Sequence, residues 1–300
     1  MQIFTTGETI GVSTDFHCSI RPKADNVATT SSVSIRQVSD SGDERFDERD
    51  VAQFERDGYV IARRMFSDSL LGEMLLIARD HLARGIGPVE YEADLHYPGA
   101  PPSREVAGGK TVRRLKQAHS RGIVFTECVS DPRLLGRLRQ LLGPRIVMPL
   151  AHHNCIMTKQ PVFSSDTGWH QDVRYWSFQR PELISAWIAL GPEFSDNGCL
   201  RLIPGTHRID LTRDRLDDEL FFRPDLPDNQ QLVHRQITAE LEPGDVLFFH
   251  ARLLHAADRN RTDRTKFSTV FTFRPQDNPP RFGSRSASLP EFTFPTPESA

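Results

Sequence analysis

The spacing of apolar and polar residues predicts helices mainly in the first half of the chain. Three segments, 47–58, 67–85 and 130–143, place apolar residues every three or four positions, which is typical of a helix with one buried face. Each segment starts at or next to a residue that can cap a first helical turn, and each ends at a glycine. We therefore expect three amphipathic helices.

Beyond Pro144 the pattern changes to short runs of β-branched and aromatic residues, separated by Gly, Pro, Asn and Asp turns. One earlier run, "YVIARRMF" at 59–66, is also expected to be a strand. The later strands are predicted near 145–158, 168–177, 183–190, 199–204, 232–241, 245–250 and 266–273. This succession predicts a mainly β fold, a double-sheet barrel or jelly roll with the helices packed outside it.

Other segments lack a sustained period. Residues 1–44 are rich in Ser, Thr, Asp and Val and are expected to form a flexible N-terminal extension before a single domain at 45–275. The Pro- and Ser-rich segment 276–300 is predicted to be an irregular C-terminal tail. Inside the domain, residues 86–110 should form an irregular loop, and the polar insertion 205–230 is a candidate lid.

Composition narrows the class of partner. The chain has 37 basic and 40 acidic residues, interspersed, so no strong field favours nucleic acid or a membrane surface. The four cysteines form no CxxC pair, which fits neither a disulfide framework nor a thiolate zinc site. The start lacks the pattern of a secretory signal, and no run is long enough to span a bilayer. We expect a cytoplasmic protein that binds a small molecule, with no prediction of its oligomeric state.

The stretch "GWHQDVRYWSF" contains candidate metal ligands. On a strand, residues two apart project from one face, so His170 and Asp172 could reach the same ion. A third ligand is needed, and His255 follows a "PGD" turn and an apolar strand that a barrel could bring alongside. Two histidines and one carboxylate leave an open face for a co-substrate and dioxygen on Fe(II). However, His-x-Asp is common by chance, and zinc hydrolysis uses similar ligands.

Two longer blocks carry a resemblance to a known family. "WHQDVRYWSFQRPELISAWIALGPEFSDNGCLRLIPGTH" and "LEPGDVLFFHARLLHAADRNRTDR", preceded by "FERDGYV", closely resemble the phytanoyl-CoA dioxygenase family of Fe(II)- and 2-oxoglutarate-dependent oxygenases. The resemblance implies a double-stranded β-helix, with His170, Asp172 and His255 as catalytic iron ligands. It also implies that 2-oxoglutarate and dioxygen are consumed, that succinate and CO2 are released, and that a small organic molecule is hydroxylated.

The resemblance also identifies candidate residues for 2-oxoglutarate, and here the chain departs from the family. Relatives place an arginine eleven residues after the distal histidine, and this chain has Lys266 there. Lysine keeps the charge but makes a point contact instead of a forked one. Ser268 shares the strand face of Lys266 and could complete a carboxylate site, while Arg264 is the alternative anchor. A solvated basic strand end is the simpler interpretation of this segment.

Other matches to the co-substrate pocket are mixed. Trp187 matches a tryptophan of that pocket, and Cys155 falls where some relatives have methionine, although each could simply be a core residue. In "KTVRRLKQAH", Arg114 or Lys116 should reach the pocket, unless this segment is a solvated edge. Ala257 replaces a serine that contacts the co-substrate in relatives.

The substrate is less well defined by the sequence. Segments 86–118 and 205–230 are the expected walls of its pocket. Four arginines would suit an anionic substrate or could be surface charge: Arg113, Arg114, Arg174 and Arg201. The histidines outside the candidate triad are expected to be mainly structural: His152, His153, His207 and His250.

Three competing functions remain open at this point. Halogenating relatives replace the metal-binding carboxylate with a small residue, so the presence of Asp172 favours hydroxylation over halogenation. A hydrolase or isomerase that uses another divalent ion is the second competitor. A non-catalytic binding protein is the third, because Lys266 and Ala257 both depart from the co-substrate pattern.

Overall fold

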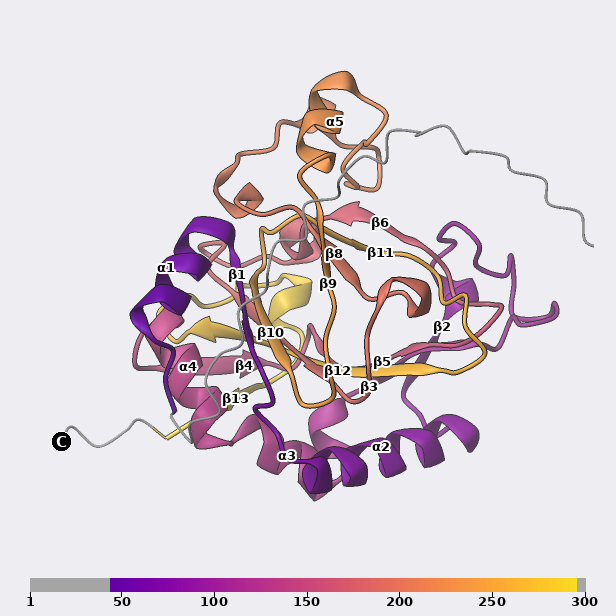
Figure 1. Ribbon diagram of the computed structural model, residues 1–300, viewed down its shortest axis with the longest axis horizontal. Helices are drawn as coiled ribbons and strands as arrows, with labels where there is room; N and C mark the ends of the chain where they lie inside the picture. The colour runs from indigo at the N-terminus through magenta and orange to yellow at the C-terminus, as the bar shows by residue number, and fades with distance from the viewer. Residues whose placement is uncertain (1–43, 296–300) are drawn as a thin grey trace, which may run out of the picture. The chain divides into compact units, whose positions relative to one another are not determined.

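The computed structural model describes residues 44–295, so the predicted extension lies, except for its last residue, outside the described part of the chain. Two antiparallel sheets face each other, and most of the helices cover the outer side of the larger sheet (Figure 1). The described helices are α1 (Glu48–Asp57), α2 (Asp68–Ala83), α3 (Ile123–Val129), α4 (Pro132–Leu142) and α5 (Pro227–Val233). The mainly β fold predicted from the sequence is confirmed.

The three predicted helices α1, α2 and α4 begin and end as their capping residues indicate. The Asp47 carboxylate accepts the Asp50 N–H at 2.8 Å, and Gly58 ends α1 with a φ of 80°, in the left-handed region that favours glycine. Asp131 caps α4 in the same way, ahead of Pro132. The helices α3 and α5 were not predicted, because both are a single short segment of seven residues with little apolar periodicity to detect.

Thirteen strands form the two sheets in the described residues. They are β1 (Tyr59–Ala62), β2 (Val89–Tyr91), β3 (Val112–Lys116), β4 (Ile146–Pro149), β5 (Asn154–Lys159), β6 (Thr167–His170), β7 (Ile184–Ala189), β8 (Leu200–Leu202), β9 (Ile237–Ala239), β10 (Val246–His250), β11 (His255–Ala257), β12 (Lys266–Pro275) and β13 (Glu291–Thr293). The larger sheet has the order β1-β10-β7-β12-β5-β3-β2, with β4 and β13 beside β12. The smaller sheet has the order β6-β11-β8-β9. This two-sheet arrangement is the double-stranded β-helix, a jelly-roll form.

The alternation along β12 places its two faces in different environments. Phe267, Phe271 and Phe273 belong to the core between the larger sheet and the helices. Val270, on the other face, packs with Trp187 of β7 in a second core between the two sheets. Lys266 and Ser268 share the face of Val270, as the predicted strand parity requires, and therefore point toward the space between the sheets.

Several predicted boundaries were wrong. The strand predicted over 145–158 is split into β4 and β5, and the one predicted over 232–241 begins inside α5. The segment 276–300 is not wholly irregular, because β13 pairs with β4. The loop 86–110 contains β2, which pairs with β3 at the sheet edge. These are short strands whose pairing partners are distant in sequence, so local pattern does not reveal them.

Figure 1 shows α2 and α3 along the larger sheet and α5 beyond β6, on the side of the smaller sheet. Leu232 and Val233, at the end of α5, pack against the apolar cluster that contains Trp169 of β6. Phe222 of the insertion 205–230 belongs to that cluster, and its N–H donates to the Trp169 carbonyl at 2.7 Å. The insertion therefore lies beside the strand that leads to the candidate metal ligands. Within residues 44–295, no helix has the length and apolar character needed to cross a membrane.

Candidate active site

The three predicted metal ligands meet at one point. His170 ends β6, and His255 begins the adjacent strand β11, directly opposite it in the register. One ligand atom from each of His170, Asp172 and His255 lies within 4.8 Å of the others. The predicted strand over 168–177 was wrong in its length, because Asp172 starts a 3-10 turn. That turn, and not strand parity, brings the carboxylate back toward the two histidines.

Both histidines are oriented by their second ring nitrogen. His170 Nδ1 lies 2.8 Å from the Gly168 carbonyl oxygen, and His255 Nδ1 lies 2.9 Å from that of Leu253. A carbonyl accepts only from a protonated nitrogen, so Nδ1 carries the hydrogen and Nε2 presents its lone pair. The two Nε2 atoms lie 3.9 Å and 3.6 Å from Asp172 Oδ1, which is too far for hydrogen bonds but suits ligands of one shared ion.

The surroundings keep these ligands ready for a cation. Burial, together with nearby His255 and Arg174, holds the pKa of His170 well below its usual range, so the ring is neutral. The other oxygen of Asp172 is 3.4 Å from Ser185 Oγ and 3.5 Å from His153 Nδ1. His153, one of the histidines expected to be mainly structural, therefore lies beside the carboxylate of the candidate ligand Asp172.

The donor set fits Fe(II). Two imidazoles and one carboxylate match the facial arrangement of non-haem iron, and no fourth His, Cys, Asp or Glu joins the group among residues 44–295. Structural zinc sites normally have four protein ligands, so this set is that of a centre with open positions.

Two cavities border the candidate ligands. The first, here the Tyr97 cavity, has a volume of about 330 Å³ and is lined by Tyr97, Arg114, Cys155, Arg174 and Trp176 as well as by His170 and Asp172. The second, here the Lys266 cavity, extends from His170 and His255 to Met157, Lys159, Trp187 and Lys266. The candidate ligands therefore lie between two adjoining cavities, which share His170 as a lining residue.

At its end of the cavity, Lys266 is paired with a buried carboxylate that the sequence did not identify. Glu193 is 2% exposed; its Oε2 accepts from the Lys266 ammonium at 2.8 Å, and its Oε1 accepts from Ser268 Oγ at 2.5 Å and from the Trp187 indole at 2.8 Å. The Lys266 ammonium also lies 5.0 Å from the centre of the Trp187 ring. All three predicted co-substrate residues at this end thus share one buried partner. No spacing signal pointed to Glu193, because the pairing crosses from β12 to the loop after β7.

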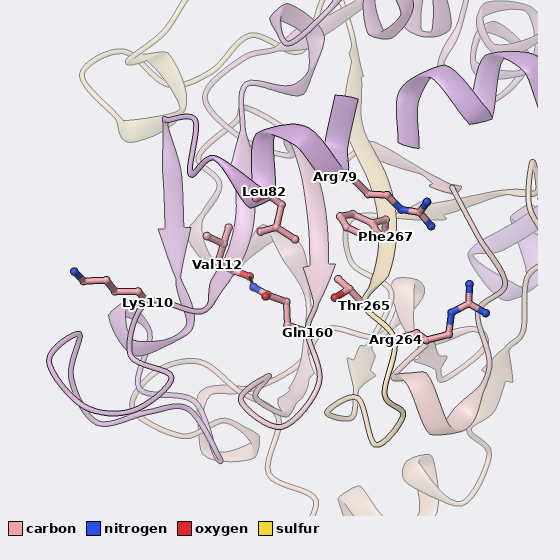
Figure 2. Close-up of a pocket in the computed structure, with 9 residues that line it drawn as sticks. Arg79, Leu82, Lys110, Val112, Gln160, Arg264, Thr265 and Phe267 are labelled. Carbon is pink, nitrogen blue, oxygen red and sulfur yellow. Dashed lines mark hydrogen bonds between the residues drawn. The ribbon is translucent and has the colours of Figure 1, made fainter. Parts of the chain in front are cut away.

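The remaining predicted co-substrate residues are divided between several places. Cys155 lines the Tyr97 cavity, and so do Arg114 and Lys116, which both pair with Glu90 at 2.9 Å and 3.5 Å. Arg264 is exposed and lies in a separate surface groove with Arg79 and Thr265, as Figure 2 shows. The structure does not bring Arg264 to the candidate metal ligands.

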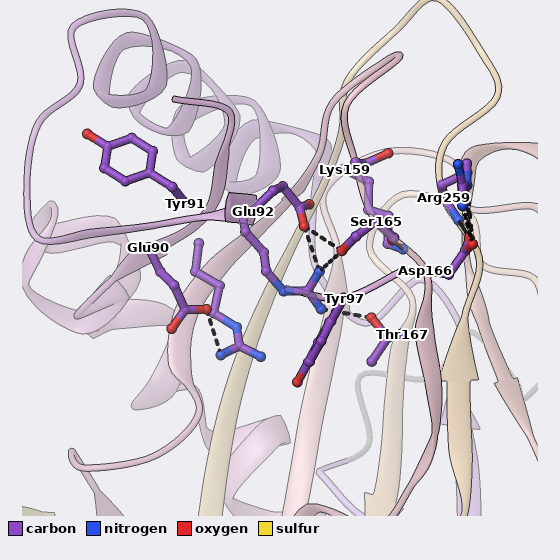
Figure 3. A network of polar contacts seen from close by, with 12 residues as sticks. Glu90, Tyr91, Glu92, Tyr97, Lys159, Ser165, Asp166, Thr167 and Arg259 are labelled. Atoms are coloured by element: carbon purple, nitrogen blue, oxygen red, sulfur yellow. Dashed lines mark hydrogen bonds and ion pairs between the residues drawn. The ribbon is translucent and has the colours of Figure 1, made fainter. Parts of the chain in front are cut away.

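A buried polar network supports the strand that carries His170. Arg113 donates to Glu92 at 3.0 Å, to Ser165 Oγ at 3.0 Å and to Thr167 Oγ1 at 2.8 Å. Figure 3 shows Glu92, Ser165 and Thr167 in this network, with Lys159 nearby. The network fixes the start of β6 against the 92–98 loop, which provides Tyr97.

Lys159 joins the two strands that carry the candidate histidines. Its ammonium donates to the Ser165 carbonyl at 2.9 Å, to the Ala257 carbonyl at 3.3 Å and to that of Asp258. Ser165 precedes β6, and Ala257 ends β11. Burial, and then the nearby cations Arg113 and Lys266, lower the pKa of Lys159 to about 7. No local spacing in the sequence indicates a role for this lysine.

A double-stranded β-helix that presents two histidines and a carboxylate beside open cavities defines the class of Fe(II)- and 2-oxoglutarate-dependent oxygenases. Comparison with known proteins agrees. A family model, "Phytanoyl-CoA dioxygenase (PhyH)", matches residues 54–268. The chain belongs to this family.

Individual relatives support the same fold. An ectoine dioxygenase of Bordetella bronchiseptica is 25% identical over 254 residues, which cover 78% of each chain. The solved structure of EctD from S. alaskensis with 2-oxoglutarate and 5-hydroxyectoine superposes with a TM-score of 0.66 at 21% identity, covering 82% of each chain. The epimerase SnoN, in complex with Fe3+, α-ketoglutarate and nogalamycin RO, gives a TM-score of 0.63 at 21% identity and covers 78% of this chain and 85% of its own.

Proposed function

We propose that this protein is a cytoplasmic hydroxylase that uses Fe(II), 2-oxoglutarate and dioxygen to oxidise a small, anionic organic molecule. The observation that carries the proposal is the convergence of ligand atoms from His170, Asp172 and His255 between two cavities. One cavity would hold the co-substrate and the other the substrate.

In this proposal His170, Asp172 and His255 hold the iron. When bound, Fe(II) supplies the redox chemistry that couples decarboxylation of 2-oxoglutarate, to succinate and CO2, to oxidation of a substrate C–H bond. The protein contributes geometry. The Gly168 and Leu253 carbonyls hold both imidazoles with Nε2 toward the ion, and the Arg113 network and Lys159 keep the two strands in register.

Lys266 is proposed to bind the far carboxylate of 2-oxoglutarate. Its ammonium has three N–H donors, and Glu193 and Ser268 accept two of them, at 2.8 Å and 3.3 Å. The third remains for a co-substrate carboxylate in the Lys266 cavity, with Trp187 as one wall. Arg114 lines both cavities and is proposed as a further contact, while Lys116 and Cys155 lie farther along in the Tyr97 cavity. The groove position of Arg264 favours Lys266 as the anchor.

The charges of the Tyr97 cavity favour an anionic substrate. Four cations line it, Arg114, Lys116, Arg174 and Arg285, against the carboxylates of Glu90 and of the metal ligand Asp172. This excess of positive charge would attract an anion and raise its local concentration. The presence of Asp172 as a third ligand favours hydroxylation over halogenation.

The proposal is tested with purified protein and Fe(II), screening small metabolites for those that stimulate conversion of 2-oxoglutarate to succinate. Turnover should require oxygen. The His255→Ala variant should lose at least about tenfold of metal affinity and of succinate formation, because residues that only support metal ligands already contribute about 10–100-fold. A protein that neither binds 2-oxoglutarate nor forms succinate with any metabolite, or that turns over without oxygen, would contradict the proposal.

A further inference from the structure

One arginine beside the candidate metal ligands has no anionic partner in residues 44–295. Arg174 lies two residues after Asp172, in the same 3-10 turn. Its Nη2 donates to the Tyr97 hydroxyl at 2.8 Å, whereas its Nη1 is buried from solvent and has no hydrogen-bond partner in the described structure. The guanidinium carbon lies 3.7 Å from the centre of the Phe221 ring and 4.5 Å from that of Tyr175.

The other arginines that the sequence suggested for an anionic substrate are already paired. Arg113 pairs with Glu92 at 3.0 Å, Arg114 with Glu90 at 2.9 Å, and Arg201 with Asp258 at 2.7 Å. Of these four arginines, only Arg174 keeps its charge uncompensated by a carboxylate of the described chain. It is therefore distinguished from surface charge by its position and by its missing partner.

The environment of Arg174 is costly for a cation without a counter-ion. A desolvated N–H with no acceptor costs free energy, and the aromatic faces of Phe221 and Tyr175 compensate only part of the charge. They do, however, hold the guanidinium plane in a fixed position. A planar fork held on an aromatic face is well suited to a carboxylate, which can accept two parallel hydrogen bonds from it.

Both predicted walls of the substrate pocket meet at this arginine. Tyr97 comes from segment 86–118 and Phe221 from segment 205–230, and their rings contact each other edge to face at 5.4 Å. Phe221 also packs edge-on against His170, with ring centres 5.8 Å apart. The Phe221 ring thus contacts both the Arg174 guanidinium and a candidate metal ligand. An anion bound there would contact both walls and lie next to the metal.

We propose that Arg174 is the recognition site for a carboxylate of the substrate, and that the substrate is a small organic acid. This inference rests on the proposed function. The 2-oxoglutarate carboxylates are the other possible source of the anion. However, Arg174 lines the Tyr97 cavity and not the Lys266 cavity, whereas Lys266 lines the Lys266 cavity and not the Tyr97 cavity. The geometry therefore assigns Arg174 to the substrate and not to the co-substrate.

The test uses the full-length protein loaded with Mn(II) and 2-oxoglutarate, so that binding is measured without turnover. Benzoate, phenylacetate and hexanoate are titrated alongside their primary amides, and binding is followed by melting temperature and by tryptophan fluorescence. The wild type should bind at least one acid about tenfold or more tightly than its amide, as expected for a charge-assisted hydrogen-bonded pair. Arg174→Gln should reduce that ratio to near one by weakening the acid alone. Arg174→Lys, which keeps the charge without the fork, should fall between them.

Arg49→Gln is the matched control, because it removes the same charge from an exposed position on α1 and should leave the ratio unchanged. Circular dichroism establishes that each variant is folded. Equal binding of acids and amides by the wild type, or an unchanged ratio in both Arg174 variants, overturns the assignment. Weaker 2-oxoglutarate binding by Arg174→Gln with the acid–amide ratio intact also overturns it, in favour of the co-substrate. Failure of the wild type to bind 2-oxoglutarate contradicts the proposed function instead.

Discussion

The charged groups at the two ends of the Lys266 cavity are paired in opposite ways. At the metal end, Asp172 Oδ1 lies 3.6 Å and 3.9 Å from the two histidine Nε2 atoms, so these polar groups surround a common point without bonding to one another. At the other end, Lys266, Ser268 and Trp187 all donate to Glu193 at 2.5–2.8 Å. The first arrangement needs an added cation to be complete, whereas the second already contains its own.

This difference explains how lysine can stand where relatives have arginine. Arginine is held in place by the planar geometry of its fork, but a lysine ammonium is a mobile point charge. Here Glu193 and Ser268 fix the ammonium, and the whole group is buried. Because the Lys266–Glu193 pair is neutral overall, it attracts a carboxylate less strongly than an unpaired cation would. Substitutions at Lys266 and Glu193 can separate a structural contribution of this ion pair from a functional one.

The largest effect is expected from Lys266→Met. Glu193 would remain buried without its cation, so the free energy of unfolding should fall by about 3–5 kcal/mol. The affinity for 2-oxoglutarate should also fall strongly, while metal affinity is retained because the metal ligands are not touched. Urea unfolding measures the first effect, and calorimetric titration with 2-oxoglutarate and with Mn(II) measures the other two.

The double variant Lys266→Met with Glu193→Gln separates these roles. Removing the uncompensated charge should restore most of the lost stability without restoring 2-oxoglutarate affinity. If the double variant regained affinity, or if Lys266→Met bound 2-oxoglutarate like the wild type, then Lys266 would be a structural residue only.

A smaller effect is expected on acidification, and it should arise at His250. His250 ends β10 and precedes the turn that leads to His255. Burial first, then the positive charges of His207 and Arg252, lower its pKa to about 4. Its Nδ1 accepts the Arg252 N–H at 3.0 Å, which requires an unprotonated nitrogen.

Between pH 6.5 and 4 the unfolded chain therefore binds a proton at His250 that the folded protein does not, so stability rises with pH across this window and is lost as pH falls. The loss at His250 is on the order of 3 kcal/mol. Urea unfolding of metal-free wild type and His250→Gln at several pH values measures it, and the variant should show a shallower acid loss. Parallel curves for the two proteins would exclude His250 as a source of the acid sensitivity.

Much of the fold and of the candidate site could be predicted from the sequence. The parts that could not be predicted have physical causes. The helix caps and the parity of Lys266 and Ser268 depend on local spacing, which a single chain displays directly. The candidate metal ligands combine the local His-x-Asp spacing with His255, a distant residue that the family resemblance implied. Glu193 and Lys159 act through contacts between residues distant in sequence, and local pattern carries no sign of them. Asp172 is an intermediate case: the residue was identified, but the turn that orients it replaced the predicted strand. The proposed role of Arg174 depends on which arginines lack a partner in the folded chain, and local pattern does not show this.

The smallest effect is expected from Arg264→Ala, which tests the alternative anchor for 2-oxoglutarate. Arg264 is exposed in the groove of Figure 2 and lines neither cavity beside the candidate metal ligands. Because an exposed side chain without a buried partner contributes little, stability should change by less than about 0.5 kcal/mol. The affinity for 2-oxoglutarate should match that of the wild type, in contrast to Lys266→Met. A loss of affinity in Arg264→Ala as large as in Lys266→Met would mean that Arg264, and not Lys266 alone, anchors 2-oxoglutarate when it binds. The contrast between the two ends of the cavity would then no longer hold.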